Sequence, residues 1–209
     1  MKNPGPLEAY EALVLSCAAP PHADALAELR RAFEGRTGAF GPEDPWFEVR
    51  SRAFWDDALT TQGFARDAAL SAGEELVPWG LAFSRAHRGL FERYEDRAVT
   101  VDDGCVLVRD VISGAAFVVD VDPAIGDAVF RADGFFDARL VGVRGRVGML
   151  PGAVFHRTDA RAPILEVVKR ASEKGMHPDR TLDALLRMEL RLTSLSRVKV
   201  AYAYRAEGL

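Results

Sequence analysis

Cysteine is scarce in this sequence, and no long apolar run occurs in it. Its two cysteines, Cys17 and Cys105, are too few for the disulfide framework of a small secreted domain or for a structural zinc site. No apolar stretch approaches the roughly 20 residues that cross a bilayer. Residues 1–6 also lack the charged and apolar regions of a signal peptide. We therefore expect a cytoplasmic protein without membrane contact.

Short catalytic and metal-binding motifs are absent as well. There is no phosphate-binding loop and no serine nucleophile elbow. The glycine-rich run at 142–148 lies between expected strands, so it is interpreted as a hairpin turn rather than a dinucleotide loop. The histidines do not fall at a metal-ligand spacing. We expect no metal and no cofactor.

Composition is that of an ordinary globular chain. Its 209 residues are 48% apolar and 28% charged, with a formal net charge of −4. The charge is uneven: from His156 onward eleven Lys/Arg stand against seven Asp/Glu, whereas the preceding residues hold sixteen against twenty-four. Two interpretations stay open. The imbalance reflects chance differences between solvated surfaces, or it marks a basic C-terminal face that meets an acidic partner.

Helical periodicity dominates both ends of the chain. Apolar residues recur at helical spacing in a region over residues 1–86 and again over 158–209. The expected helices cover 6–18, 22–34, a segment opening at Pro45, 62–70, 159–175 and 178–196. The tail at 198–204 alternates apolar and polar residues, which slightly favours an edge strand over a continued helix.

The period changes to that of strands over residues 87–157. Alternation at 99–101, 106–108 and 117–121 is followed by two expected strands at 135–143 and 147–155, with turns at Gly104, Gly114 and Gly145. The pattern predicts an α+β protein whose centre is an antiparallel β-meander or a small barrel. In strand number and turn spacing this stretch resembles SH3-like and OB-like barrels, which host many functions.

The hairpin near Gly145 carries the main argument for nucleic-acid binding. Arg139, Arg144 and Arg146 lie close together in the sequence, and the same or adjacent expected strands carry Phe135, Phe136 and Phe155. Barrels that bind single strands combine a cationic groove with aromatic platforms. The alternative is that the phenylalanines fill the core and nearby aspartates dilute the charge.

The last long helix is a candidate docking surface. Arg180, Arg187 and Arg191 share one face of it, and the cations Arg197, Lys199 and Arg205 follow. Such a face suits an acidic protein or a phosphate backbone. The alternative is a solvated face tempered by ion pairs.

An enzyme remains a further alternative. It requires a pocket between the N-terminal helices and the β-rich centre, with His156 or His87 as the working group. Cys105 is a poor nucleophile because Asp102 and Asp103 raise the pKa of its thiol.

Our leading hypothesis is a non-catalytic binding or adaptor protein. We expect a protein partner, docked through the β-rich centre or the basic C-terminal helix, with nucleic-acid binding as the alternative.

Overall fold

The computed structural model describes residues 5–61, 63–96, 98–143, 145–195, 199–205 and 209. The chain before the sheet is helical. Its elements are α1 (Pro6–Cys17), a 3-10 turn (Pro20–His22), α2 (Ala23–Thr37), α3 (Phe47–Thr60), α4 (Phe64–Ala72), a second 3-10 turn (Glu74–Leu76) and α5 (Val77–Phe83).

Among the described residues, six strands form one mixed sheet. They are β1 (His87–Arg93), β2 (Cys105–Asp110), β3 (Ala116–Asp120), β4 (Phe136–Val143), β5 (Arg146–Met149) and β6 (Val154–Phe155), with helix α6 (Pro123–Phe130) between β3 and β4. The pairing order is β1-β2-β3-β5-β4-β6, and β4 also pairs with β1. Five strands therefore form a ring. All of the pairings are antiparallel except β3 with β5, where Asp120 lies opposite Gly148.

The interior of the ring is filled by every second residue of its strands. Phe91, Val108, Val119, Phe136 and Leu140 belong to one buried cluster there. The phenylalanine rings stack through this interior, with 5.9 Å between the centroids of Phe91 and Phe136. Alternation along a strand puts the intervening residues on the outer face of the ring.

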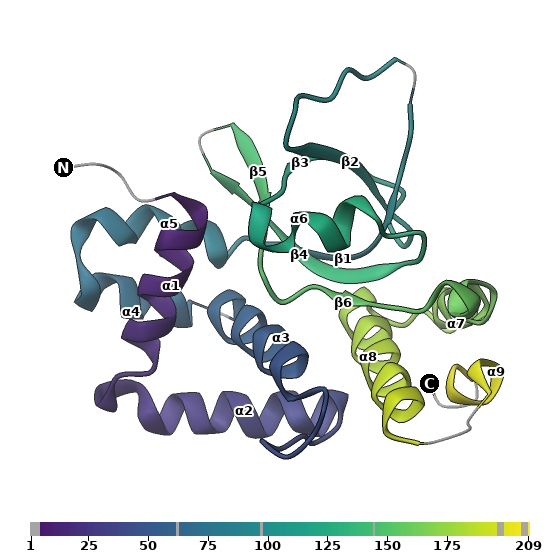
Figure 1. Cartoon of the computed structure of the whole chain (residues 1–209). Helices are drawn as coiled ribbons and strands as arrows, with labels where there is room; N and C mark the ends of the chain where they lie inside the picture. Colours follow the sequence, from purple (N-terminus) through teal and green to yellow (C-terminus); the bar gives the residue numbers. More distant parts are fainter. Residues whose placement is uncertain (1–4, 62, 97, 144, 196–198, 206–208) are drawn as a thin grey trace.

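Helices cover the outer face from two directions (Figure 1). The N-terminal helices α1 and α5 share a buried cluster with Val141 of β4 and with Leu150. On the other side, Leu90 and Phe135 pack in a cluster with the C-terminal helices. Those helices are α7 (Arg161–Glu173), α8 (Pro178–Ser194) and α9 (Val200–Ala203), preceded by a 3-10 turn (Thr158–Ala160).

The mixed α/β class and the β-rich centre between helical ends are confirmed. The expected turns at Gly104 and Gly114 are also confirmed, at φ of 84° and 76°, where glycine avoids the steric cost of a Cβ. The SH3-like or OB-like identity of the ring stays a prediction.

Several sequence predictions are wrong. The described residues 98–103 form no strand; the first strand is β1, and Val99 is 37% exposed. The alternation at 99–101 does not produce a strand, because no described strand pairs with this segment. The expected strand at 147–155 is divided into β5 and β6 by Pro151 and Gly152, since proline offers no N–H to a ladder.

Two further elements differ from expectation. Helix α6 follows Asp122, where only a turn was expected, and it interrupts the meander between β3 and β4. In the tail, Val200–Ala203 forms a helical turn rather than a strand. Residue 198, the first of that predicted strand, lies outside the described residues. None of the described helices combines the length and the apolar character needed to span a bilayer.

Candidate functional site

A pocket of about 630 Å³ lies between the outer face of the sheet and helices α1 and α5. Its apolar wall includes Leu7 of α1, Trp79 and Phe83 of α5, Val141 of β4 and Leu150 after β5. The size falls within the range of about 300–1,000 Å³ that small-molecule sites occupy, and such sites are mostly apolar. The chain therefore holds a concavity suited to a small, largely apolar molecule.

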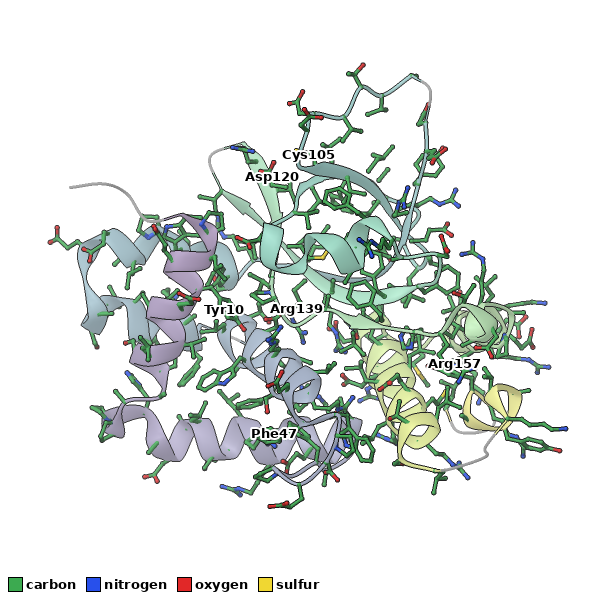
Figure 2. The ribbon with its side chains drawn as sticks, viewed as in Figure 1. Tyr10, Phe47, Cys105, Asp120, Arg139 and Arg157 are labelled. Carbon is green, nitrogen blue, oxygen red and sulfur yellow. The ribbon has the colours of Figure 1, made fainter. Side chains whose placement is uncertain are left out.

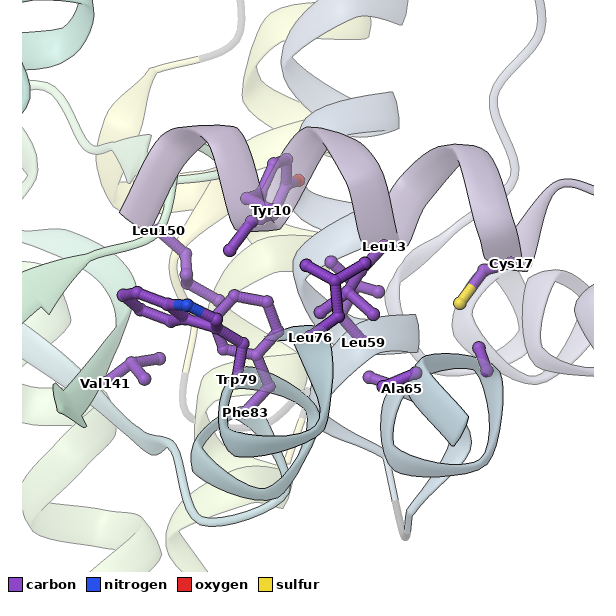
Figure 3. Close-up of a cluster of buried hydrophobic side chains, with 13 residues drawn as sticks. Tyr10, Leu13, Cys17, Leu59, Ala65, Leu76, Trp79, Phe83, Val141 and Leu150 are labelled. Carbon is purple, nitrogen blue, oxygen red and sulfur yellow. The ribbon is translucent and has the colours of Figure 1, made fainter. Parts of the chain in front are cut away.

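Aromatic side chains shape the wall on the helix side. Figure 3 shows Trp79 and Phe83 beside Val141 and Leu150, with Tyr10 of α1 next to them. The rings of Trp79 and Phe83 have centroids 6.2 Å apart, and those of Tyr10 and Phe83 are 6.4 Å apart and edge-on. These contacts fix α1 and α5 against each other. Helices distant in the sequence thus form one continuous wall.

Glycine at position 148 leaves part of the sheet-side wall open. Gly148 lines the pocket and pairs with Val141, so both face the helices from the outer side of the ring. A Cβ added to Gly148 would meet no atom within 4 Å. The free volume of the pocket therefore extends directly over this position.

Charged groups from four elements line the pocket, and Glu11 of α1 is one of them. Arg146 of β5 pairs with Asp120 of β3 at 2.7 Å, and this hydrogen bond lowers the pKa of the Asp120 carboxyl. Cys105 donates its thiol to the same carboxylate at 3.0 Å, which raises the pKa of the thiol. Arg52 of α3 also lines the pocket, and among the described residues no ion-pair or hydrogen-bond partner engages its guanidinium. Arg52 is therefore available to a polar group of a ligand.

Asp56 of α3 lies behind this wall and is fully buried. Its Oδ1 accepts the Tyr10 hydroxyl at 2.9 Å, and its Oδ2 accepts the N–H of Gly152 at 2.9 Å. Burial raises the pKa of the Asp56 carboxyl to about 7, against the lowering effects of Arg139, the Tyr10 hydroxyl and the Gly152 N–H. The Asp56 carboxyl, which changes charge near neutral pH, is thus bonded to α1 through Tyr10 and to the segment after β5 through Gly152.

A chain of ion pairs runs under the sheet next to Asp56. Arg139 of β4 pairs with Asp57 of α3 at 2.5 Å, and Asp57 pairs with Arg36 of α2 at 2.7 Å. Arg36 continues to Asp183 of α8 at 3.0 Å. Figure 2 shows Arg139 near Tyr10, where the N-terminal helices meet the sheet. The chain of charges therefore crosses from the sheet through α3 and α2 to the C-terminal helices.

The same chain returns to the sheet through Arg88 of β1. The Arg88 guanidinium donates to Asp183 at 2.7 Å and to both oxygens of Asp137 of β4, at 2.8 and 3.2 Å. All three side chains are less than 10% exposed. Buried charges require such mutual pairing. The whole chain of ion pairs therefore joins five elements, namely α2, α3, α8, β1 and β4.

The structure separates the cations of the hairpin. Arg139 is buried in its pair with Asp57 and contributes no charge to a surface, whereas Arg146 is 75% exposed and bound to Asp120. Arg144 lies outside the described residues. The aromatic neighbours Phe135 and Phe136 are buried in different clusters, and Phe155 is partly buried against Phe136. The described hairpin therefore presents no aromatic platform beside a row of cations.

The three arginines of α8 do share a solvent face. Arg180, Arg187 and Arg191 are all exposed. Arg187 donates from Nε to the main-chain oxygen of Arg36 at 3.1 Å, which ties it to α2. Asp183 between them is turned inward to the ion pairs. The exposed face of α8 is therefore basic, as its spacing predicts.

Neither expected histidine reaches the pocket. His156 is buried, its Nδ1 lies 2.7 Å from the Tyr204 hydroxyl, and burial lowers its pKa to about 4. His87 lies on β1, 3.1 Å from Asp110. Both lie elsewhere in the fold than the pocket lining, which counts against an enzyme that uses them there. Within the described part of the chain, no group of three His, Cys, Asp or Glu residues could hold a metal ion.

The functional groups that the sequence did not indicate are Tyr10, Arg52 and Asp56. Asp56 carries no local signal, because an adjacent Asp56-Asp57 pair on a helix is usually solvated. Both carboxyls are instead buried by elements far away in the chain. No protein-family model, curated protein or solved structure was found to match this chain.

Proposed function

We propose that this chain is a non-catalytic binding protein that holds a small, mostly apolar molecule in the pocket between α1, α5 and the sheet. The observation that carries the proposal is the pocket itself, about 630 Å³ with an aromatic and aliphatic wall. Its described lining contains no histidine, cysteine or serine. Arg52 and Glu11 at the pocket suit a polar end on the ligand. The expected cytoplasmic location remains a prediction.

The substitution Gly148→Leu tests this proposal. The leucine side chain extends into the open volume of the pocket, so we expect it to weaken ligand binding about tenfold or more, a loss of about 1.4 kcal/mol or more. The probe is N-phenyl-1-naphthylamine, an uncharged dye that fluoresces in apolar sites. Binding is measured by fluorescence titration, with energy transfer from tryptophan, since Trp79 lines the pocket.

Gly142→Leu is the matched control. Gly142 lies on β4 in the same hairpin, a Cβ there also meets nothing within 4 Å, and it does not line the pocket. We expect wild-type binding from this variant. Equal dye binding by wild type and Gly148→Leu would refute the proposal. Organic extraction of the purified protein followed by mass spectrometry then identifies the molecule that wild type and Gly142→Leu carry and Gly148→Leu lacks.

The exposed arginines of α8 favour a second candidate function, the docking of an acidic protein partner. The double variant Arg180→Glu/Arg191→Glu reverses two of these charges and leaves Arg187, which also bonds α2. We expect it to lose partners that wild type recovers from the native host by affinity purification, and nuclease treatment should not remove them. Partners that depend on nuclease-sensitive material would instead favour nucleic-acid binding.

The control is Lys169→Glu/Lys174→Glu, which makes the same change in net charge on the exposed side of α7 and just after it. Specific docking at α8 predicts that this control retains the partners. Loss of the same partners in both double variants would show that net charge, and not the α8 face, governs their recovery.

A further inference from the structure

Two walls of the pocket are joined through one carboxyl group. Tyr10 lines the pocket from α1, and Gly152 directly follows Pro151, which lines it from the segment after β5. Asp56 accepts a hydrogen bond from each, one per oxygen, both at 2.9 Å. The spacing between α1 and this segment is therefore set by Asp56.

The contact at Gly152 leaves no spare room. A Cβ added there would lie 2.5 Å from the main-chain oxygen of Arg52 and 2.6 Å from Cγ of Asp56. Only glycine allows the main chain to approach α3 this closely. The approach brings the Gly152 N–H onto Asp56, next to Arg52, which itself lines the pocket.

We propose that Asp56 is the positioning residue of this pocket, whose ionised carboxylate holds both walls in the ligand-binding arrangement and makes ligand affinity depend on pH. This inference rests on the proposed function.

The surroundings of Asp56 bring its ionisation close to neutral pH. The groups that face it are the Tyr10 hydroxyl from α1, Arg139 and Asp137 from β4, and the Gly152 N–H. Burial raises the pKa of Asp56 to about 7, and Asp137 adds to that rise. Arg139, Tyr10 and Gly152 lower it. Both charge states are therefore populated near pH 7.

Protonation removes one of the two acceptors. An ionised carboxylate accepts one hydrogen bond from each donor. In the neutral acid one oxygen carries a proton, so the hydrogen bond at that oxygen is lost or must run in the opposite direction. The bond that remains is no longer charge-assisted and is weaker. We therefore expect the walls to loosen, and ligand affinity to fall, as the pH falls through about 7.

The test is a titration of the wild-type protein with N-phenyl-1-naphthylamine at a series of pH values. The dye carries no group that titrates in this range, so the profile reports the protein. We expect affinity to fall about five- to tenfold on the acid side, with the change beginning near pH 7. Circular dichroism at each pH verifies that the protein stays folded.

Two variants separate positioning from a merely structural role. Tyr10→Phe removes a hydrogen bond that lowers the pKa of Asp56. We therefore expect the midpoint of the profile to move to higher pH, with or without a change in the affinity at high pH. Asp56→Asn cannot titrate, so a flat profile at the weak level is expected. The control Asp67→Asn removes a carboxylate that is 64% exposed on α4 and should keep the wild-type midpoint.

The outcomes distinguish this inference from the proposed function. A wild-type profile that is flat across neutral pH, or a Tyr10→Phe midpoint that does not move, overturns the role of Asp56 even if Gly148→Leu still blocks the dye. If Asp56→Asn does not fold, wild type and Tyr10→Phe decide alone. Failure of the dye to bind at any pH, or its indifference to Gly148→Leu, overturns the proposed function itself.

Discussion

The substitution Arg88→Met is expected to lower the free energy of unfolding by about 3–5 kcal/mol. Arg88 is the shared partner of Asp137 and Asp183, and all three side chains are buried. Methionine fills a similar volume but donates no hydrogen bond, so two carboxylates lose their nearest cation. The loss should appear as a lower urea midpoint at neutral pH with an unchanged slope.

A second substitution reveals the source of the loss. Arg88→Met leaves the buried Asp137 without the ion pair that Arg88 supplies, whereas Asp183 keeps its pair with Arg36 at 3.0 Å. An unpaired buried carboxylate is costly, and a neutral side chain of the same shape removes that cost. Adding Asp137→Asn to Arg88→Met should recover about 1–3 kcal/mol at neutral pH.

Arg157→Met is the matched control. It breaks an arginine–aspartate pair of similar geometry, Arg157 with Asp159 at 2.7 Å, whose side chains are 64% and 54% exposed. Solvent already stabilises both charges there, so we expect little change in stability. Similar losses from the two variants would contradict a structural role for the buried chain of ion pairs.

Strand β4 shows how far the sequence pattern reaches. Apolar and polar residues alternate from Phe136 to Leu140, and the apolar ones, Phe136, Ala138 and Leu140, share the face inside the ring. This alternation does not predict what covers the other face. Asp137 and Arg139 have the pattern of a solvated side, but helices bring Arg88 and Asp57 to them from 49 and 82 positions away.

The pocket could be predicted only in outline. A pocket between the N-terminal helices and the β-rich centre was only a requirement of the enzyme alternative, with His156 or His87 in it, and neither histidine lines the pocket found there. The identity of its polar groups was not predictable, because Tyr10 and Asp56 meet across 46 positions with no motif. Local periodicity indicates which residues share one face of a helix or strand. A site built from the faces of several elements also depends on how those elements pack together.

The missed elements have local causes. The segment Pro123–Phe130 begins at a proline directly after Asp122, a pattern shared by turns and by helix starts. Alternation around Val99 predicts a strand only if a partner strand is available, and none of the described strands pairs with it. In both places short-range signals were compatible with two structures, and the tertiary fold decided between them.

Phe136→Ala is expected to lower the free energy of unfolding by about 3–5 kcal/mol. Phe136 is fully buried inside the ring of strands, between Phe91 and Phe155, with ring centroids 5.9 and 5.4 Å away. Strands around a closed ring share their hydrogen bonds with neighbours on both sides, so they cannot collapse freely into the space that alanine leaves. The cavity therefore persists, and its cost adds to that of the lost apolar burial.

Phe130→Ala gives the matched comparison, because it makes the same chemical change on α6 at a side chain that is 38% exposed. We expect a smaller loss, about 1–2 kcal/mol, since the Phe130 side chain is partly solvated in the folded protein and no closed cavity forms. Denaturant unfolding of the two variants measures the difference directly. Equal losses would mean that the interior of the ring can relax around the missing side chain. The phenylalanines inside the ring would then not fix the arrangement of the strands, and that role would be left to the buried ion pairs on its outer face.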